Sequence, residues 1–282
     1  MSNVKQPFRW QGSKVRMLSK ILPLIESARG DAPVYVEPFG GSGTVLNALK
    51  PVKIEVYNDA DERLVDFFRA LADDEALAKM KRWGETFPKS RAIYDEMKRD
   101  WIKSPELAKR GFATFYVQSF SFGGKPFDSF GVERKIYTCH DHSLPAAYQR
   151  KTAALDAFAE RFRFVNIERL DWRECVAKYD SEQAFFYLDP PYLGKQKGCY
   201  RRDLPLVDHA ELVETILSVR GGVALSCYDN DVYAPLERAG WKRYDFEASS
   251  SAKRSTDNIG EQRRRVETLY VSPAREGEND RL

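Results

Sequence analysis

The chain has 282 residues, of which 43% are hydrophobic and 31% charged, a globular composition that excludes a wholly disordered chain. Lys and Arg number 45 and Asp and Glu 42, a formal net charge of +3 that is compatible with a nucleic-acid partner but too small to indicate one. The four cysteines stand apart, which favours reduced thiols in an intracellular protein. Because the N-terminal residues lack an apolar signal core and no apolar run is long enough to span a bilayer, we expect a cytoplasmic protein without membrane segments.

Short apolar runs predict the strands of one β-sheet. Residues 34–37 and 54–57 read as strands, with a glycine-rich turn and a helical stretch between them. Residues 162–167, 184–188 and 222–227 read as further strands, whose near-continuous apolar character suits a parallel sheet covered on both faces.

The rest of the pattern completes the predicted architecture. Helical periodicity over residues 207–217 supplies a crossover connection, and residues 242–247 and 266–271 alternate like a strand pair. These features predict a doubly wound α/β sheet with an antiparallel edge strand. Residues 62–151 have a high charge density and mostly helical signals, so we expect a mostly helical insertion between the second and third strands.

A glycine-rich turn follows the first predicted strand and precedes a helical pattern: Glu37-Pro38-Phe39-Gly40-Gly41-Ser42-Gly43. Glycines let the backbone pass close to a ligand, and the N–H groups at the start of the next helix can bind it. The pattern is not Gly-x-Gly-x-x-Gly, and no phosphate-binding Lys follows it, so a nucleoside site and a plain tight turn are both open.

The second predicted strand ends in Asn58-Asp59. An acidic side chain at the tip of this strand is placed to accept hydrogen bonds from ribose hydroxyls. The alternative is that Asp59 caps the following helix, a role that Asp61 can also fill. Together with the glycine turn, this position favours a cofactor that contains a nucleoside.

The most informative motif is Asp189-Pro190-Pro191-Tyr192, directly after the buried run 184–188. Two prolines cannot continue a central strand, so the sheet must stop here. A carboxylate and an aromatic ring then stand at the carboxyl ends of the strands, where open α/β sheets bind ligands. The alternative is that the motif serves only to end the strand.

These residue types suit transfer of a methyl group to the exocyclic amine of a base. Such an amine is a poor nucleophile because its lone pair is delocalised into the ring. The Asp189 carboxylate and the Pro190 carbonyl can each accept one amino N–H, which stabilises the positive charge that develops as the methyl group arrives. Tyr192 can stack on the base after it has swung out of the duplex.

In these motifs and in their order, the chain resembles the adenine-specific DNA methyltransferases of the Dam type over nearly its whole length. Phe8-Arg9-Trp10-Gln11-Gly12-Ser13-Lys14 looks like the N-terminal motif of that family, Lys-Trp-x-Gly-Gly-Lys, with Ser13 in place of the second Gly. Residues 37–43 look like its S-adenosylmethionine-binding turn, and residues 189–192 like its catalytic tetrad. The segment Ser249–Leu269 is similar to its closing Ser-rich loop, basic cluster and Glu-x-Leu strand.

The resemblance implies a Rossmann-like S-adenosylmethionine-dependent methyltransferase sheet with an inserted target-recognition domain. It also implies roles for further residues. Trp10 and Lys14 would contact the methionine end of the cofactor, and Asp59 would hold its ribose. Asp171 and Trp172 would lie around its adenine, while Asp189 would sit beside both the methionine amino group and the target base.

One segment departs from the family. Tyr116–Gly124 lies where the Dam-type pattern has Asn-Arg-x-x-x-Asn-Gly in its DNA-reading module, which puts the GATC target in doubt. This stretch and the residues after it still carry side chains suited to reading bases. Donors for purine edges are Gln118, Lys125 and Arg134, and apolar wedges for the space left by a flipped base are Phe122 and Phe127.

Two basic clusters flank the predicted active site. The first is Lys195, Lys197, Arg201 and Arg202, and the second is Lys253, Arg254, Arg263, Arg264 and Arg265. A charge run is usually a solvated surface, but the position of both runs favours contacts to DNA phosphates. Arg9 of the N-terminal motif is a further expected DNA contact.

Metal and thiol chemistry find less support. Cys139, His140 and His142 lie close together, but no fourth ligand with suitable spacing is evident, so we expect no metal. Cytosine C5 methylation normally needs a thiolate nucleophile, and no Cys stands at the Pro-Cys turn expected for it.

We therefore expect S-adenosylmethionine-dependent methylation of adenine N6 in a specific duplex DNA sequence, by direct in-line transfer to a flipped base. Residues 1–61 and 152–282 would form the catalytic domain and residues 62–151 the target-recognition insertion. Double-stranded DNA is the expected partner, and the resemblance allows a cognate restriction endonuclease acting on the same site. Two alternatives stay open: an amino methyltransferase acting on cytosine N4 or on RNA, and a non-catalytic DNA-binding relative.

Overall fold

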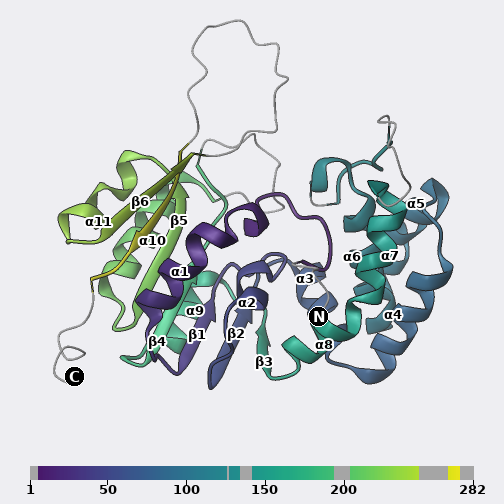
Figure 1. Cartoon of the computed structure of the whole chain (residues 1–282), viewed down its shortest axis with the longest axis horizontal. Coiled ribbons are helices and arrows are strands. Elements are labelled where there is room, and N and C mark those ends of the chain that lie inside the picture. The colour runs from purple at the N-terminus through teal and green to yellow at the C-terminus, as the bar shows by residue number, and fades with distance from the viewer. Residues whose placement is uncertain (1–5, 126, 134–141, 194–203, 248–265, 274–282) are drawn as a thin grey trace, which may run out of the picture.

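The computed structural model describes residues 6–125, 127–133, 142–193, 204–247 and 266–273. Within these ranges one seven-stranded sheet forms the centre of the protein, with helices packed on both faces (Figure 1). The strands are β1 (Val34–Glu37), β2 (Ile54–Asn58), β3 (Val165–Glu168), β4 (Ala184–Leu188), β5 (Gly222–Tyr228), β6 (Lys242–Glu247) and β7 (Val266–Val271).

The strands lie in the order β3-β2-β1-β4-β5-β7-β6. The first five of these are parallel, and β7 runs antiparallel between β5 and β6. The prediction of a doubly wound α/β sheet with an antiparallel edge is confirmed. The edge strand is β6, and it pairs antiparallel with β7.

The third strand begins later than the apolar pattern predicted. β3 begins at Val165, whereas Phe162 is the last residue of α8. Phe162 is buried together with the residues three, four and seven positions before it, which is the spacing of one helix face. Phe164 is 87% exposed. The two phenylalanines at 162 and 164 therefore belong to a helix end and a turn.

Two apolar cores lie on opposite faces of the sheet because alternate side chains of a strand point to opposite faces. In β4, Phe185 and Tyr187 belong to one core and Phe186 and Leu188 to the other. The first core includes residues of α1 (Leu18–Arg29) and α2 (Thr44–Ala48). The second includes residues of α9 (Trp172–Tyr179), α10 (Leu206–Ser218), which is the predicted crossover, and α11 (Ala234–Arg238).

Among the described residues between β2 and β3 there are six α-helices, and most of them lie together beyond the β3 edge (Figure 1). They are α3 (Glu62–Leu71), α4 (Asp74–Thr86), α5 (Arg91–Arg99), α6 (Leu107–Phe120), α7 (Leu144–Ala153) and α8 (Leu155–Phe162). The side chains of Asp61, Asp73, Ser90 and Ser143 each cap one of these helices by accepting a backbone N–H. The described part of 62–151 is mostly helical, and its role as a target-recognition domain stays a prediction.

After β3 the chain crosses to the other side of β1, where the next strand, β4, is added to the sheet. β2 and β3 lie on one side of β1, and β4 and β5 lie on the other. In open α/β sheets such a switch leaves a crevice at the carboxyl ends of the two central strands. Because β1 ends at Glu37 and β4 ends at Leu188, the glycine-rich turn and the tetrad meet at this crevice.

Several predicted residues fall outside the described ranges. They are Arg134, Cys139, His140, Lys195, Lys197, Arg201, Arg202, Lys253, Arg254, Arg263, Arg264 and Arg265. Within the described ranges no helix is long and apolar enough to cross a bilayer. The same residues include no group of three His, Cys, Asp or Glu side chains that could hold a metal ion.

Candidate active site

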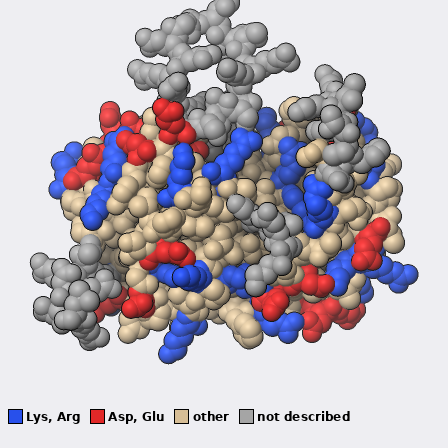
Figure 2. Space-filling model, viewed as in Figure 1, with Lys and Arg blue, Asp and Glu red and all other residues tan. Residues whose placement is uncertain are grey.

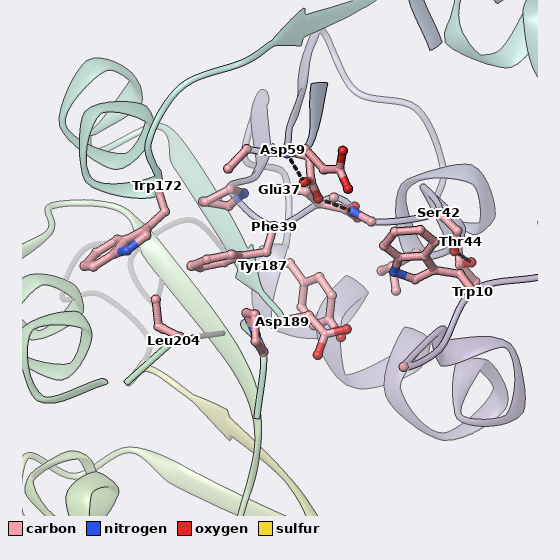
Figure 3. A pocket seen from close by; sticks show the side chains of 18 of the residues that line it. Trp10, Glu37, Phe39, Ser42, Thr44, Asp59, Trp172, Tyr187, Asp189 and Leu204 are labelled. Carbon is pink, nitrogen blue, oxygen red and sulfur yellow. Dashed lines mark hydrogen bonds between the residues drawn. The ribbon is translucent and has the colours of Figure 1, made fainter. Parts of the chain in front are cut away.

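A cavity of about 670 Å³ opens at this crevice. The predicted residues that line it are Trp10, Lys14, Glu37, Pro38, Phe39, Gly40, Gly41, Ser42, Asp59, Asp171, Trp172, Asp189 and Pro191. Figure 3 shows Phe39, Trp172 and Leu204 toward one end of the cavity and Trp10, Ser42 and Thr44 toward the other. Residues far apart in the sequence thus line one cavity. Three residues of the predicted motifs, Gly43, Pro190 and Tyr192, do not line this cavity.

The glycine turn is shaped by two left-handed residues and one close contact. Gly41 has a φ of 52° and Gly43 a φ of 64°, a region that side chains with a Cβ rarely adopt. Gly40 has no room for a side chain, because a Cβ there would lie 2.2 Å from the Tyr57 ring. The Tyr57 hydroxyl donates to the Gly41 carbonyl at 2.7 Å, so the turn is fixed against β2.

Asn58 anchors two loops at the carboxyl edge of the sheet. Its side-chain amide donates to the carbonyls of Pro38 at 2.9 Å and Leu170 at 3.2 Å, and its side-chain oxygen accepts the Leu170 N–H at 2.7 Å. The side chain is fully buried. The loops after β1 and β3 are therefore both anchored on the last residue of β2, a role that the sequence pattern did not indicate.

Asp59 lies at the tip of β2, as predicted, and its carboxylate faces the glycine turn. One oxygen accepts the Gly41 N–H at 2.9 Å and the other accepts the Asp61 N–H at 2.8 Å. Burial raises the pKa of Asp59 to about 6, against these two hydrogen bonds, which lower it. The helix-capping alternative is filled by Asp61, whose side chain accepts the Arg63 N–H at the start of α3.

Aromatic residues from two elements stand at the other end of the cavity. The Phe39 and Trp172 rings lie 6.2 Å apart between centroids. Trp172 is 4% exposed, and its indole N–H has no hydrogen-bond partner within the described part of the chain. Asp171 caps α9 by accepting the Arg173 N–H, and the Arg173 guanidinium lies 4.5 Å from the centre of the Trp172 ring. The Trp172 indole is therefore packed against Phe39 and the Arg173 guanidinium, and its N–H group is a hydrogen-bond donor without a partner in the described part of the chain.

The tetrad carboxylate is paired with the N-terminal motif. Lys14 Nζ lies 2.7 and 2.6 Å from the two oxygens of Asp189, and it also donates to the Gly12 carbonyl at 3.1 Å. The two side chains are only 6% and 19% exposed. The same ammonium lies 4.8 Å from the centre of the Tyr192 ring. Residues 175 positions apart thus meet at the floor of the cavity.

A second carboxyl group, Glu37, lines the cavity near Asp189. It ends β1, is 2% exposed and accepts a hydrogen bond from the Tyr35 hydroxyl at 2.8 Å. Burial, reinforced by the negative charge of Asp189, raises the pKa of Glu37 to about 8, against the lowering effect of the Tyr35 hydrogen bond. At neutral pH this group is therefore mostly protonated, which adds no further negative charge beside Asp189.

The tetrad tyrosine is less accessible than the sequence suggested. Tyr192 is 6% exposed, and the Tyr228 ring packs edge-on against it at 4.5 Å between centroids. The predicted stacking of a base on this ring has little free surface in this conformation. Burial raises the pKa of Tyr192 well above its ordinary value, so its hydroxyl stays protonated.

The predicted base-reading residues divide into buried and exposed ones. Gln118 is fully buried within α6, and its amide donates to the Arg9 carbonyl at 3.1 Å while its oxygen accepts the Phe127 N–H at 2.7 Å. This conformation leaves no surface of Gln118 for a base edge, because the second half of α6 buries its polar side chains as well as its apolar ones. Phe122 is 58% exposed, and the half-exposed Lys125 lies 3.9 Å from Asp128.

The N-terminal motif lies against the turn that carries Phe122. The Gln11 N–H donates to the Gly124 carbonyl at 2.9 Å, next to the Gln118 contact with Arg9. Lys151, at the end of α7, is close enough to this motif to interact with it electrostatically. Burial, with the nearby charges of Arg9 and Arg150, lowers the pKa of Lys151 to about 7. Basic side chains are thus gathered beside the motif, and this environment favours the neutral form of Lys151, which sequence spacing alone did not predict.

Gly12 and Ser13 of the N-terminal motif also line the cavity, although the sequence reasoning assigned them no role there. Further lining residues escaped the sequence reasoning because they belong to no recognisable motif. They are Thr44, Val45, Arg169, Leu170, Arg173, Tyr187, Leu204 and Asp208. Ser13 and Ser42 each hydrogen-bond the Thr44 hydroxyl, at 3.0 and 2.8 Å. Ser13, which departs from the family pattern, is therefore integrated into the turn that it faces.

Comparisons with known proteins agree with this geometry. The model of the D12 class N6 adenine-specific DNA methyltransferase family matches residues 10–210. Two proteins named DNA adenine methylase, from a Classical Ogawa and an El Tor Inaba strain of Vibrio cholerae serotype O1, are each 24% identical over 198 residues. These alignments cover 65% of this chain and 64% of each relative, so less than two thirds of the relatives' own length is spanned. Since the family model matches most of the chain, the protein belongs to the D12 class of N6 adenine-specific DNA methyltransferases.

Proposed function

We propose that the protein transfers a methyl group from S-adenosylmethionine to the N6 amino group of adenine in a specific duplex DNA sequence. The observation that carries this proposal is the position of Asp189: it begins an Asp-Pro-Pro-Tyr tetrad and lines the cavity at the switch point of the sheet. Family membership supports adenine and DNA as the substrate class. The transfer is direct and in line, to a base flipped out of the duplex.

The cavity has the size and the donor set for a nucleoside cofactor. Its volume of about 670 Å³ lies within the range typical of small-molecule sites. The buried indole N–H of Trp172 has no partner within the described residues, and Gly40 and Gly41 of the glycine turn line the cavity without side chains. These features fit an adenosyl group bound between an aromatic end and a glycine turn.

The roles of individual residues follow from this fit. Trp172, Asp171 and Phe39 hold the adenine end, and Asp59 holds the ribose through lone pairs that its two backbone hydrogen bonds leave open. Trp10 and Lys14 lie at the methionine end. S-adenosylmethionine supplies an electrophilic methyl group when it is bound.

Asp189 acts on the target amine. Each carboxylate oxygen accepts Lys14 through one lone pair and has a second one for an amino N–H. The Pro190 carbonyl accepts the other amino hydrogen. This arrangement would stabilise positive charge on the nitrogen as the carbon–nitrogen bond forms and the methyl carbon–sulfur bond of the donor breaks, which leaves a neutral thioether. No general base is needed, because the methylated ammonium product loses its proton readily.

DNA would lie against the part of the molecule that carries the N-terminal motif and the Phe122 turn. Figure 2 shows Lys and Arg side chains along the upper part of the face in view, with Asp and Glu side chains among them at the upper left. Phe122 is the exposed aromatic side chain available as a wedge, and Lys125 is a donor for a base edge. We include residues 62–151 as the target-recognition unit in this proposal. A cognate restriction endonuclease that cuts the same site is a further proposed partner.

The test is to incubate the protein with S-adenosylmethionine and unmethylated duplex DNA, and to identify the modified nucleosides by mass spectrometry. N6-methyladenine is the expected product, and Asp189→Ala should bind DNA but form it at least about a hundredfold more slowly. N4-methylcytosine, or modification of RNA alone, would move the assignment to another amino methyltransferase. DNA binding without any methylation would identify a non-catalytic relative.

The cofactor site has its own test. Asp59→Ala should weaken S-adenosylmethionine binding about ten- to a hundredfold in calorimetric titration, because a charged hydrogen-bond acceptor is lost. Asp73→Ala, which removes the helix cap of α4 and lies outside the cavity lining, is the control and should leave this affinity nearly unchanged. Equal effects of the two substitutions would show that Asp59 does not contact the ribose.

A further inference from the structure

The tetrad turn cannot be held by its own backbone donors. Pro190 and Pro191 lack an N–H group, so their carbonyl oxygens are the only backbone atoms through which hydrogen bonds can fix them. The turn must nevertheless be placed accurately, because Asp189 precedes it directly and Pro191 lines the cavity. A donor from elsewhere in the fold is therefore expected at one of these carbonyls.

His209 supplies that donor. It lies in the first turns of α10, is fully buried, and its Nε2 is 3.1 Å from the Pro191 carbonyl oxygen. Its Nδ1 is 2.7 Å from the hydroxyl of Tyr233, which is also fully buried and belongs to the 3₁₀ turn Asp231–Tyr233. A chain of two hydrogen bonds thus runs from Tyr233 through His209 to Pro191, the third residue of the tetrad.

The tautomer of the imidazole follows from its partners. A carbonyl oxygen can only accept, so Nε2 carries the hydrogen and Nδ1 is the bare nitrogen. The Tyr233 hydroxyl must then donate to Nδ1. Burial lowers the pKa of His209, which keeps the ring neutral and this arrangement of donors intact. Both ring nitrogens are used, and neither touches the cavity.

We propose that His209, oriented by Tyr233, is a positioning residue for methyl transfer that fixes the Asp-Pro-Pro turn through the Pro191 carbonyl. The inference rests on the proposed function of the tetrad as the acceptor of the target amine. It assigns His209 no contact with DNA or cofactor. Its effect is to keep the Asp189 carboxylate and the Pro190 carbonyl at the separation that one amino group can bridge.

The test compares variants that keep or remove the donor at the Nε2 position. His209→Gln places an amide N–H near that position, whereas His209→Asn is too short and reaches only the Nδ1 side. With unmethylated duplex DNA and S-adenosylmethionine, His209→Asn should lower kcat roughly 10- to 100-fold, because a small misplacement of reacting groups is sufficient for such a loss. KM for DNA and the cofactor Kd should change less than about threefold, and His209→Gln should retain most of kcat.

Tyr233→Phe and a control separate positioning from stability. Tyr233→Phe should lower kcat less than His209→Asn, and the double variant should be no slower than His209→Asn, because the two residues act in one chain of hydrogen bonds. Tyr270→Phe removes a hydroxyl that donates to Glu237 at 2.8 Å beside Tyr233, and it should leave kcat near the wild-type value. Circular dichroism melts ensure that every variant is assayed while folded.

The outcomes separate this inference from the proposed function. Equal losses in His209→Asn and His209→Gln, additive losses in the double variant, or a kcat loss in Tyr270→Phe that matches His209→Asn would each overturn the positioning role while wild-type methylation stands. A wild-type protein that forms no N6-methyladenine would overturn the proposed function and this inference with it.

Discussion

The ion pair between Lys14 and Asp189 should contribute more to stability than its exposed counterparts on the surface. The ammonium contacts both carboxylate oxygens, at 2.7 and 2.6 Å, and the side chains are 6% and 19% exposed. At an effective dielectric constant of about 20, unit charges at this distance attract by about 6 kcal/mol. Most of this attraction is offset by removing both groups from water. Loss of one partner should therefore cost about 1.5–3 kcal/mol, the usual value for a charged hydrogen bond.

A double-mutant cycle measures this contribution. Lys14→Met keeps the aliphatic stem, and Asp189→Asn keeps the shape of the carboxylate. Each single substitution should lower the free energy of unfolding in urea by about 1.5–3 kcal/mol, and the double variant should recover part of the loss. The coupling energy should be about 1–3 kcal/mol, toward the lower end because Asp189 faces the cavity and water can reach it.

The surface pair Lys81–Asp156 is a matched control. Its Nζ–Oδ2 distance is also 2.6 Å, but its side chains are 36% and 60% exposed. The same cycle there should give a coupling of about 0.2–1 kcal/mol, and added salt should reduce it further. Equal coupling energies for the two pairs would refute the argument, because burial would then not set the strength of the contact.

Two further predictions concern Glu37 and the glycine turn. Because the pKa of Glu37 is about 8 in the folded protein and ordinarily 4.5, the folded state binds this proton more tightly, and the wild-type free energy of unfolding should fall as pH rises from about 4.5 to about 8. Glu37→Gln should flatten this part of the profile in urea unfolding, and an unchanged slope would mean that another group sets it. Gly43→Ala should cost about 2–4 kcal/mol in the same assay, because its φ is 64° and its Cβ would lie 2.8 Å from both Phe68 and Phe162. Gly123→Ala has a φ of 65° with nothing within 4 Å, so it should cost only about 1 kcal/mol, and equal losses would contradict the packing argument.

The positions of the motifs could be predicted because strand ends carry local signals. Pro190 and Pro191 stop β4 where the apolar run ends, and the glycines after Glu37 mark the end of β1. The limits of this reasoning appear at Phe162, where an apolar run looked like strand but continued a helix face. A short apolar segment does not distinguish a strand from the end of a helix, because both structures bury the same types of side chain.

Contacts between distant residues could not be predicted in the same way. Asn58 contacts Leu170 across 112 positions, and which loops meet at β2 depends on the strand order rather than on any local pattern. Gln118 shows the opposite error. We predicted that it reads bases because it is polar and lies in a divergent segment. In the structure every residue of α6 from Gly111 to Phe120 is buried. The polar residues of this stretch therefore do not mark an exposed helix face.

The polar side chains around this site serve mainly to hold backbone in place. Asn58 anchors the carbonyls of two loops, His209 binds a third at the tetrad, and Lys14 joins the N-terminal motif to the end of β4. Each anchor comes from an element other than the one it fixes, so the turns at the carboxyl edge of the sheet are coupled to one another. Precise placement of reacting groups depends on such supports. On the proposed function, a residue with no contact to the substrate, such as His209, should therefore still affect the rate of methyl transfer, though less than loss of Asp189 does.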